Sequence, residues 1–152
     1  MEAIAALFVR AGVPCRVSPQ IAVDLWTKLI MNCAYNAISA LSRTRYGPIA
    51  RDPGTREVVR QAVEETIAVA RAAAVALPES GLVEAAWKLG EHAMENAVSS
   101  TAQDLARGKR TEIDSLNGYV VRRGAELGVP TPVNQTLHAL VKLLEESAAA
   151  GE

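Results

Sequence analysis

Three polar side chains, Lys28, Asn32 and Asn36, lie four residues apart in a stretch that is otherwise poor in charge. From Leu29 to Ser42 the chain carries no charged residue, whereas a surface helix normally fills its outer face with charges. Residues four apart share one ridge of a helix, so these side chains are predicted to line a half-buried polar strip that meets a hydrogen-bonding partner. The spacing is equally explained if both asparagines bond to neighbouring helices or face water.

A second polar segment lies between Asn96 and Asp114. It begins with small polar residues, Ser99-Ser100-Thr101, and continues through the basic run Arg107-Gly108-Lys109-Arg110 to Glu112. An acid at this point could merely complement a helix dipole, and the basic run could be a solvated loop. The alternative is that Glu112 couples to Lys28, so that the two converge on a substrate carbonyl as a proton donor and its electrostatic partner.

The composition excludes several classes of protein. The chain has 152 residues, 49% of them hydrophobic and 22% charged, with a net charge of −1, which fits neither a disordered chain nor a nucleic-acid binder. No apolar run reaches the roughly 18 residues of a membrane span, and no Gly-rich phosphate loop is present. The two cysteines and two histidines are too scattered for a zinc site, so we expect no metal. Both Cys15 and Cys33 are predicted to be small buried hydrophobes in a reducing cytoplasm.

Helical periodicity recurs along the chain and predicts a single all-α domain of six or seven helices. Residues 1–12 form an amphipathic helix with Ile4, Leu7 and Phe8 on one side, and their abrupt start is expected of a piece of something longer. The sequence next predicts a helix over 18–42 with Ser18 as N-cap, a turn-rich connection over 46–54 and a helical stripe from Val59 to Ala74. Helices are expected over about 82–98 and 100–106. A further helix begins at Thr111, with a capping box over 111–114, and is ended by residues 128–130, and the last helix runs over about 134–148.

The two polar segments resemble ketopantoate reductases. Residues 25–41 are similar to the Trp-x-Lys-x3-Asn-x3-Asn helix that opens the family's C-terminal domain. Residues 99–104, 109–114 and 117–118 are similar to its Ser-Ser/Met-x2-Gln-Asp, Thr-Glu-Ile-Asp and Asn-Gly signature, and residues 128–134 resemble the Gly-Val-x-x-Pro-x-Asn turn before its last helix. The order and spacing of these motifs, over about residues 20–145, make the resemblance specific.

The resemblance implies a C-terminal domain of the 6-phosphogluconate dehydrogenase C-terminal-like fold over residues 1–152. The family reduces 2-dehydropantoate to pantoate with NADPH, on the way to pantothenate and coenzyme A. Its N-terminal Rossmann domain, absent from this chain, holds NADP(H). The chain alone is therefore expected to bind no cofactor and to be inactive, and no cofactor-binding residue is assigned in it.

The resemblance also implies the role of each site residue. Lys28 would be the general acid that protonates the oxygen of the reduced ketone. As a cation already in place, it would also stabilise the negative charge that forms on that oxygen. Asn32 and Asn36 would orient the substrate, a small 2-keto acid. Ser100 would bind its carboxylate, and Glu112 would bind its hydroxyl end and tune Lys28.

Two alternatives to this function stay open. The turn Arg43-Thr44-Arg45-Tyr46-Gly47 lacks an asparagine that some members offer the substrate, so a related reductase for another 2-keto acid is an alternative. A free-standing helical module for dimerisation or protein binding is another, because long, Ala-rich apolar helices suit helix–helix packing. A homodimer is compatible with each of these readings. No membrane or nucleic-acid partner is expected, and the expected location is cytoplasmic.

Overall fold

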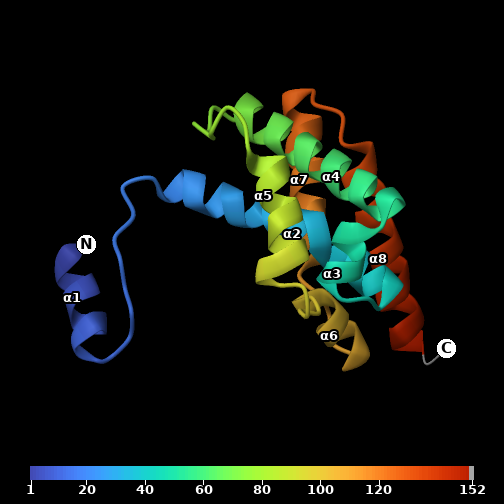
Figure 1. Ribbon diagram of the computed structural model, residues 1–152, viewed down its shortest axis with the longest axis horizontal. Coiled ribbons are helices and arrows are strands. Elements are labelled where there is room, and N and C mark those ends of the chain that lie inside the picture. The colour runs from blue at the N-terminus through green and yellow to red at the C-terminus, as the bar shows by residue number, and fades with distance from the viewer. Residues whose placement is uncertain (151–152) are drawn as a thin grey trace.

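The computed structural model describes residues 1–150, with side chains as far as Ala148, and within this range every regular element is helical (Figure 1). The helices are α1 (Glu2–Arg10), α2 (Ile21–Ser42), α3 (Tyr46–Arg51), α4 (Pro53–Ala72), α5 (Leu82–Lys88), α6 (Ser100–Ala106), α7 (Asn117–Leu127) and α8 (Pro132–Ala150), with a π-helical turn η1 (Leu89–Ala93) and a 3₁₀ turn η2 (Ile113–Ser115). The all-α prediction is confirmed. The described range holds eight α-helices rather than six or seven, because part of the predicted turn-rich connection folds as α3.

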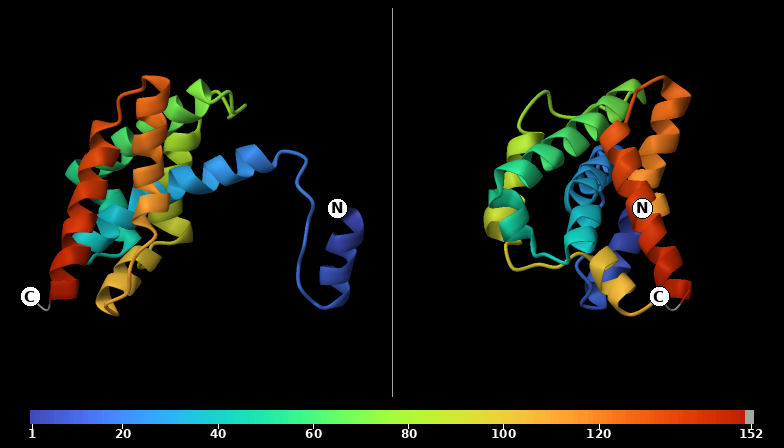
Figure 2. Two further views of the ribbon diagram at one scale, coloured as in Figure 1. Left: turned by 180° about the vertical axis from the view of Figure 1, so that it is seen from behind. Right: turned by 90° about the vertical axis from the view of Figure 1, so that its right-hand side faces the viewer.

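Helix α2 is the centre of the bundle. It packs against α3, α4, α5, α6 and α8, and in the right-hand view of Figure 2 it lies between α4 and α5 on one side and α7 and α8 on the other. Its buried residues are Ile30 and every position from Cys33 to Ala40. A helix enclosed on all sides has no outer face to fill with charge, which explains the uncharged stretch that the sequence shows.

Tyr35 fixes α2 against the neighbouring elements. Its ring stacks on that of Tyr46 with 4.6 Å between the ring centroids, and its hydroxyl donates a hydrogen bond of 2.8 Å to the carbonyl oxygen of Ala86. Gly90 lies against the same ring so closely that an added Cβ would collide with the phenol. The helix predicted over 82–98 therefore changes at this contact from α5 to the wider turn η1, and ends at Ala93.

Two predicted helix caps are wrong, for local reasons. The Ser18 hydroxyl accepts from the backbone N–H of Gln20 at 3.0 Å, a turn outside α2, which starts at Ile21. The Thr111 hydroxyl accepts from the N–H of Ile113 at 3.2 Å and so opens η2 instead of α7. The short helix over 100–106 is confirmed as α6, and the Ser99 hydroxyl caps it by accepting the N–H of Ala102 at 3.0 Å.

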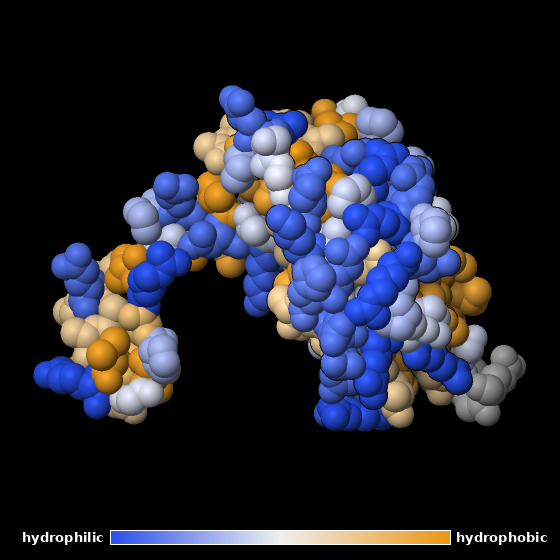
Figure 3. All heavy atoms as spheres, viewed as in Figure 1, coloured by the Kyte–Doolittle hydropathy of each residue, from blue (hydrophilic) through white to orange (hydrophobic). Residues whose placement is uncertain are grey.

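Helix α1 stands away from the bundle at the end of the connecting segment 11–20 (Figures 1 and 2). It has no buried residue, and its predicted apolar side chains Ile4, Leu7 and Phe8 are exposed, as the orange surface on α1 in Figure 3 shows. Cys15, in the connecting segment, is exposed and not buried as predicted, whereas Cys33 is buried. Over residues 1–150, each helix is too short or too polar to cross a membrane.

Candidate active site

The predicted ridge of α2 runs from solvent into the core. Lys28 is exposed, Asn32 is half-buried, and Asn36 is only 4% exposed. The first turns of α2 project beyond the other helices, so that Ile21 and Leu25 on the same side are exposed as well (Figure 1). The ridge therefore has its lysine in solvent and its second asparagine buried in the bundle.

Asn36 is held by two hydrogen bonds. The Tyr46 hydroxyl donates to its Oδ1 at 2.9 Å, and the Ser99 hydroxyl donates to its backbone carbonyl oxygen at 3.1 Å. Burial raises the pKa of Tyr46, so this phenol stays a hydrogen-bond donor. The Asn36 amide nitrogen has no acceptor among the described residues and does not belong to their fully buried polar atoms, so it can donate to a ligand.

Ser99 joins the start of α6 to the buried half of α2. Its backbone N–H donates to the Ser39 hydroxyl at 3.3 Å, and its own hydroxyl bonds the Asn36 carbonyl. Ser100 follows directly as the first residue of α6 and is exposed. The structure thus brings Ser100 next to the part of α2 that carries Asn36.

Glu112 lies on the segment that leads into η2, and its side chain is exposed. Its carbonyl oxygen accepts the N–H groups of Ser115 at 2.8 Å and Leu116 at 3.1 Å. This segment reaches α2 at Cys33, where Leu116 packs and where the Asn117 side-chain amide donates to the Cys33 carbonyl oxygen at 3.4 Å. Within residues 1–150 Glu112 makes no ion pair with Lys28, so the coupling of these two side chains stays a prediction.

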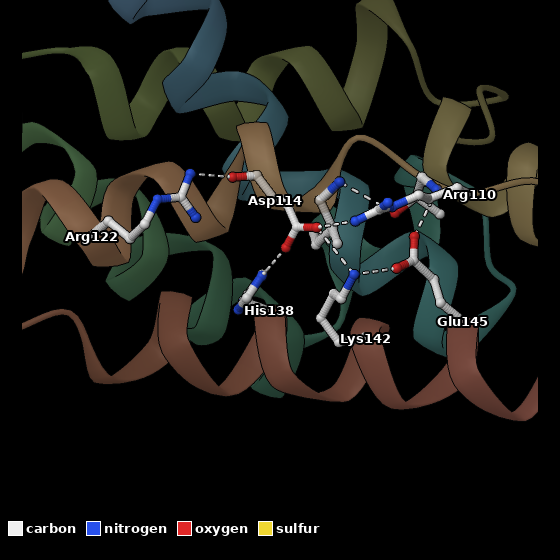
Figure 4. Close-up of polar contacts among 8 residues, drawn as sticks. Arg110, Asp114, Arg122, His138, Lys142 and Glu145 are labelled. Atoms are coloured by element: carbon white, nitrogen blue, oxygen red, sulfur yellow. Dashed lines mark hydrogen bonds and ion pairs between the residues drawn. The ribbon is translucent and has the colours of Figure 1, made fainter.

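Sequence reasoning missed Tyr46 and a polar cluster at Asp114. The carboxylate of Asp114 contacts His138 at 2.7 Å and Lys142 at 3.0 Å, both on α8 (Figure 4). Hydrogen bonds from His138 and then Lys142 lower the pKa of Asp114 to about 2. A signal was present, because positions 138, 142 and 145 share one face of a helix and all are polar.

The remaining titratable groups offer little further chemistry. Burial raises the pKa of the Cys33 thiol to about 12, which makes it an inert core residue. In the described part of the chain, no three histidine, cysteine, aspartate or glutamate side chains come together as metal ligands.

Fold and site together define the class of the chain: an all-α domain built around a central helix whose polar ridge runs from solvent into the core. The chain belongs to the ketopantoate reductase family, because the family model described as "Ketopantoate reductase PanE/ApbA C terminal" matches residues 20–145.

Individual relatives agree with this assignment. The chain is 36% identical over 151 residues to a 2-dehydropantoate 2-reductase of Pyrobaculum aerophilum, with 99% of this chain and 53% of that protein covered. It is 39% identical over 147 residues to the protein of the same name from Halobacterium salinarum, covering 95% and 47%. The chain thus spans about half the length of the curated relatives that it matches.

Solved structures give the same picture. The PanE/ApbA family ketopantoate reductase from Ralstonia eutropha matches with a TM-score of 0.91 and 50% identity, covering 97% of this chain and 49% of that one. A D-mandelate dehydrogenase in a ternary structure with NADH and anilino(oxo)acetate shares the fold, with a TM-score of 0.87 at 23% identity.

Proposed function

We propose that residues 1–152 form the substrate-binding and catalytic C-terminal domain of an NADPH-dependent 2-dehydropantoate 2-reductase, which makes pantoate for pantothenate and coenzyme A in the cytoplasm. The observation that carries the proposal is the ridge of α2, with Lys28 in solvent and a buried Asn36 whose amide nitrogen has no acceptor among the described residues. Two more proposed site residues, Ser100 and Glu112, lie on segments anchored to the same helix.

The ridge suits a small 2-keto acid. An amide nitrogen at Asn36 and a second amide one turn away at Asn32 can donate to substrate oxygens, and the Ser100 hydroxyl can donate to its carboxylate. The Asn36 side chain keeps one orientation because Tyr46 donates to its oxygen, which leaves its nitrogen for the ligand. Fixed donors reduce the entropy lost when a substrate binds.

Lys28 supplies the proton. As the ketone is reduced its oxygen gains negative charge, and an ammonium group in place stabilises that charge and then donates a proton to form the alcohol. Glu112 is the acidic partner, proposed to accept the hydrogen bond of the substrate hydroxyl. The exposed Lys28 needs a second surface to exclude water from this step.

The described residues do not themselves fit a dinucleotide. They form helices throughout and contain no glycine-rich turn between a strand and a helix that could hold its phosphates. In the proposed enzyme the cofactor is held by a preceding Rossmann domain and supplies the hydride. No step is therefore assigned to a group bound by this chain.

The decisive experiment uses the full-length protein that carries these residues and follows NADPH oxidation with ketopantoate. Replacing Lys28 by Ala removes the proton donor, and we expect kcat to fall by about 10²- to 10⁴-fold while NADPH binding is unchanged. Lys88→Ala is the matched control, since Lys88 is an exposed lysine at the end of α5 and should leave kcat unchanged. An unaltered kcat in Lys28→Ala would remove Lys28 from the mechanism, and no ketopantoate reduction by the wild type would overturn the substrate assignment.

A reductase for another 2-keto acid is the second candidate, favoured by the turn after α2. The residues from Arg43 to Gly47 include no asparagine, and Arg43 and Arg45 are exposed there. Steady-state rates with a panel of 2-keto acids distinguish the two candidates. A kcat/KM at least about tenfold higher for a different acid than for ketopantoate would favour this candidate.

A free-standing association module is favoured by another observation, the exposed apolar side chains of α1. Sedimentation equilibrium of the 152-residue chain tests it together with the possible homodimer. A chain that is monomeric at every concentration would exclude this reading.

A further inference from the structure

Helix α8 holds the segment that carries Glu112 through a cluster of four side chains, here called the α8 clamp: Asp114, His138, Lys142 and Glu145 (Figure 4). The three α8 residues point towards the segment 110–115, and Asp114 points back towards them. The clamp lies outside the ridge of α2 and has no role in the chemistry proposed above.

The first contact fixes the backbone directly before Glu112. The Thr111 N–H donates to Glu145 Oε1 at 2.6 Å, and the Glu145 side chain is only 10% exposed. A hydrogen bond to a carboxylate shielded from water is among the stronger kinds in proteins. Burial raises the pKa of Glu145, but hydrogen bonds from Lys142 and Thr111 outweigh it and hold that pKa below its usual value.

The second contact fixes the backbone just after Glu112. Lys142 Nζ bridges Glu145 Oε2 at 2.7 Å and Asp114 Oδ2 at 3.0 Å, so one ammonium group joins both ends of the segment. Around it, His138 contacts the other Asp114 oxygen, and Arg122 of α7 donates to the Asp114 carbonyl oxygen at 2.8 Å. Arg110 approaches Asp114 from the exposed side at 3.4 Å.

Glu112 itself is the residue in this segment that the clamp leaves free. Its neighbour Thr111 and its second neighbour Asp114 are tied to α8, its carbonyl accepts two N–H groups of η2, and Ile113 is fully buried. Its own side chain is exposed and forms no hydrogen bond or ion pair among the described residues. The backbone at Glu112 is thus rigid on both sides while its carboxylate remains available.

We propose that Glu145 and Lys142 are positioning residues for Glu112, whose carboxylate they hold in place by fixing the backbone on both sides of it. This rests on the proposed function, in which the Glu112 carboxylate binds the substrate. A carboxylate on a mobile loop would lose its freedom on every binding event, whereas one on a clamped backbone is already in place.

The first test measures kinetics of the full-length protein with ketopantoate. Glu145→Ala removes the acceptor of the Thr111 N–H, and we expect kcat/KM for ketopantoate to fall by about 10- to 100-fold with the KM for NADPH unchanged. Glu145→Gln keeps an acceptor oxygen and should restore most of that loss. Glu146→Ala is the matched control, because Glu146 is the next glutamate on α8 and is exposed.

A double-mutant cycle separates positioning from a general structural role. If Glu145 acts through Glu112, then adding Glu145→Ala to Glu112→Ala should cost less than about twofold more in kcat/KM, because neighbours that act as a unit are not additive. Multiplication of the two losses would overturn the proposal, since it would show that Glu145 acts independently of Glu112.

A second readout does not depend on the reaction. In the same proteins we expect the NMR order parameter of the Glu112 backbone amide to fall from ~0.85 to below ~0.6 in Glu145→Ala and to stay high in Glu146→Ala. An unchanged order parameter in Glu145→Ala would overturn the proposal that the α8 clamp positions Glu112, even if the enzyme reduces ketopantoate. A protein that shows the expected fall but reduces no 2-keto acid would overturn the proposed function and leave the clamp standing.

Discussion

At the scale of single residues, the orientation of Asn36 depends on one phenol. Tyr46→Phe removes the hydroxyl that donates to Asn36 Oδ1 and leaves that oxygen without its partner, at a cost of about 1–3 kcal/mol. The amide is then free to rotate, so we expect the KM for ketopantoate of the full-length protein to rise by about tenfold with little change in the KM for NADPH. Tyr119→Phe is the control, since Tyr119 is 39% exposed. Equal KM values in the two variants would show that the phenol does not orient Asn36.

The Asp114 carboxyl should make the free energy of unfolding depend on pH in the acid range. Its folded pKa is about 2 against a usual 3.8, so it stabilises the fold above about pH 4, and this contribution is lost as the pH falls towards 2. The side chain is 38% exposed, and solvent screening reduces the contribution to about 1 kcal/mol. In urea unfolding at pH 6, Asp114→Asn should lower the free energy of unfolding by this amount, and the difference from the wild type should shrink between pH 4 and pH 2. Asp104→Asn is the control. A difference in unfolding free energy between Asp114→Asn and the wild type that does not change with pH would contradict the lowered pKa of Asp114.

At the scale of elements, the start of α8 is capped from another helix. The Glu65 carboxylate of α4 accepts the N–H groups of Val133 and Asn134, each at 2.9 Å, and the Asn134 side-chain amide at 2.8 Å. Glu65→Ala leaves these donors unpaired, and we expect it to lower the free energy of unfolding by about 3 kcal/mol. Among the described residues its neighbour Glu64 pairs only with Arg60, at the surface, so Glu64→Ala should lower the free energy of unfolding by less than about 1 kcal/mol. Should Glu65→Ala not fold, Glu65→Gln still tests the cap, because it retains one acceptor, and a loss no larger than that of Glu64→Ala would contradict it.

The same helices show what sequence could predict. Periodicity predicted α2, α4 and α8 because an apolar stripe is a property of consecutive residues. On α8 only half of the apolar residues at helical spacing are core: Leu137 and Val141 are buried, whereas Leu140 and Leu144 are exposed. The Glu65 cap and the bond of Tyr35 to Ala86 were not predictable, since their partners lie 68 and 51 residues away along the chain. The ridge of α2 was predictable because spacing alone places Lys28, Asn32 and Asn36, but their burial depends on helices that pack around it.

At the scale of the whole molecule, the bundle is well packed but residues 1–25 contribute no buried side chain to it. Apolar side chains remain exposed on α1 and on the first turns of α2 (Figure 3). In the proposed enzyme a preceding Rossmann domain covers this surface, excludes water from Lys28 and holds the nicotinamide. The 152-residue chain alone should therefore show no NADPH-dependent reduction of ketopantoate.

Hydrogen exchange should also be faster over residues 2–10 and 21–25 in the chain alone than in the full-length protein, while exchange over α4 is the same in both. Reduction by the chain alone, or equal exchange over 21–25, would show that the surface beside Lys28 needs no second domain.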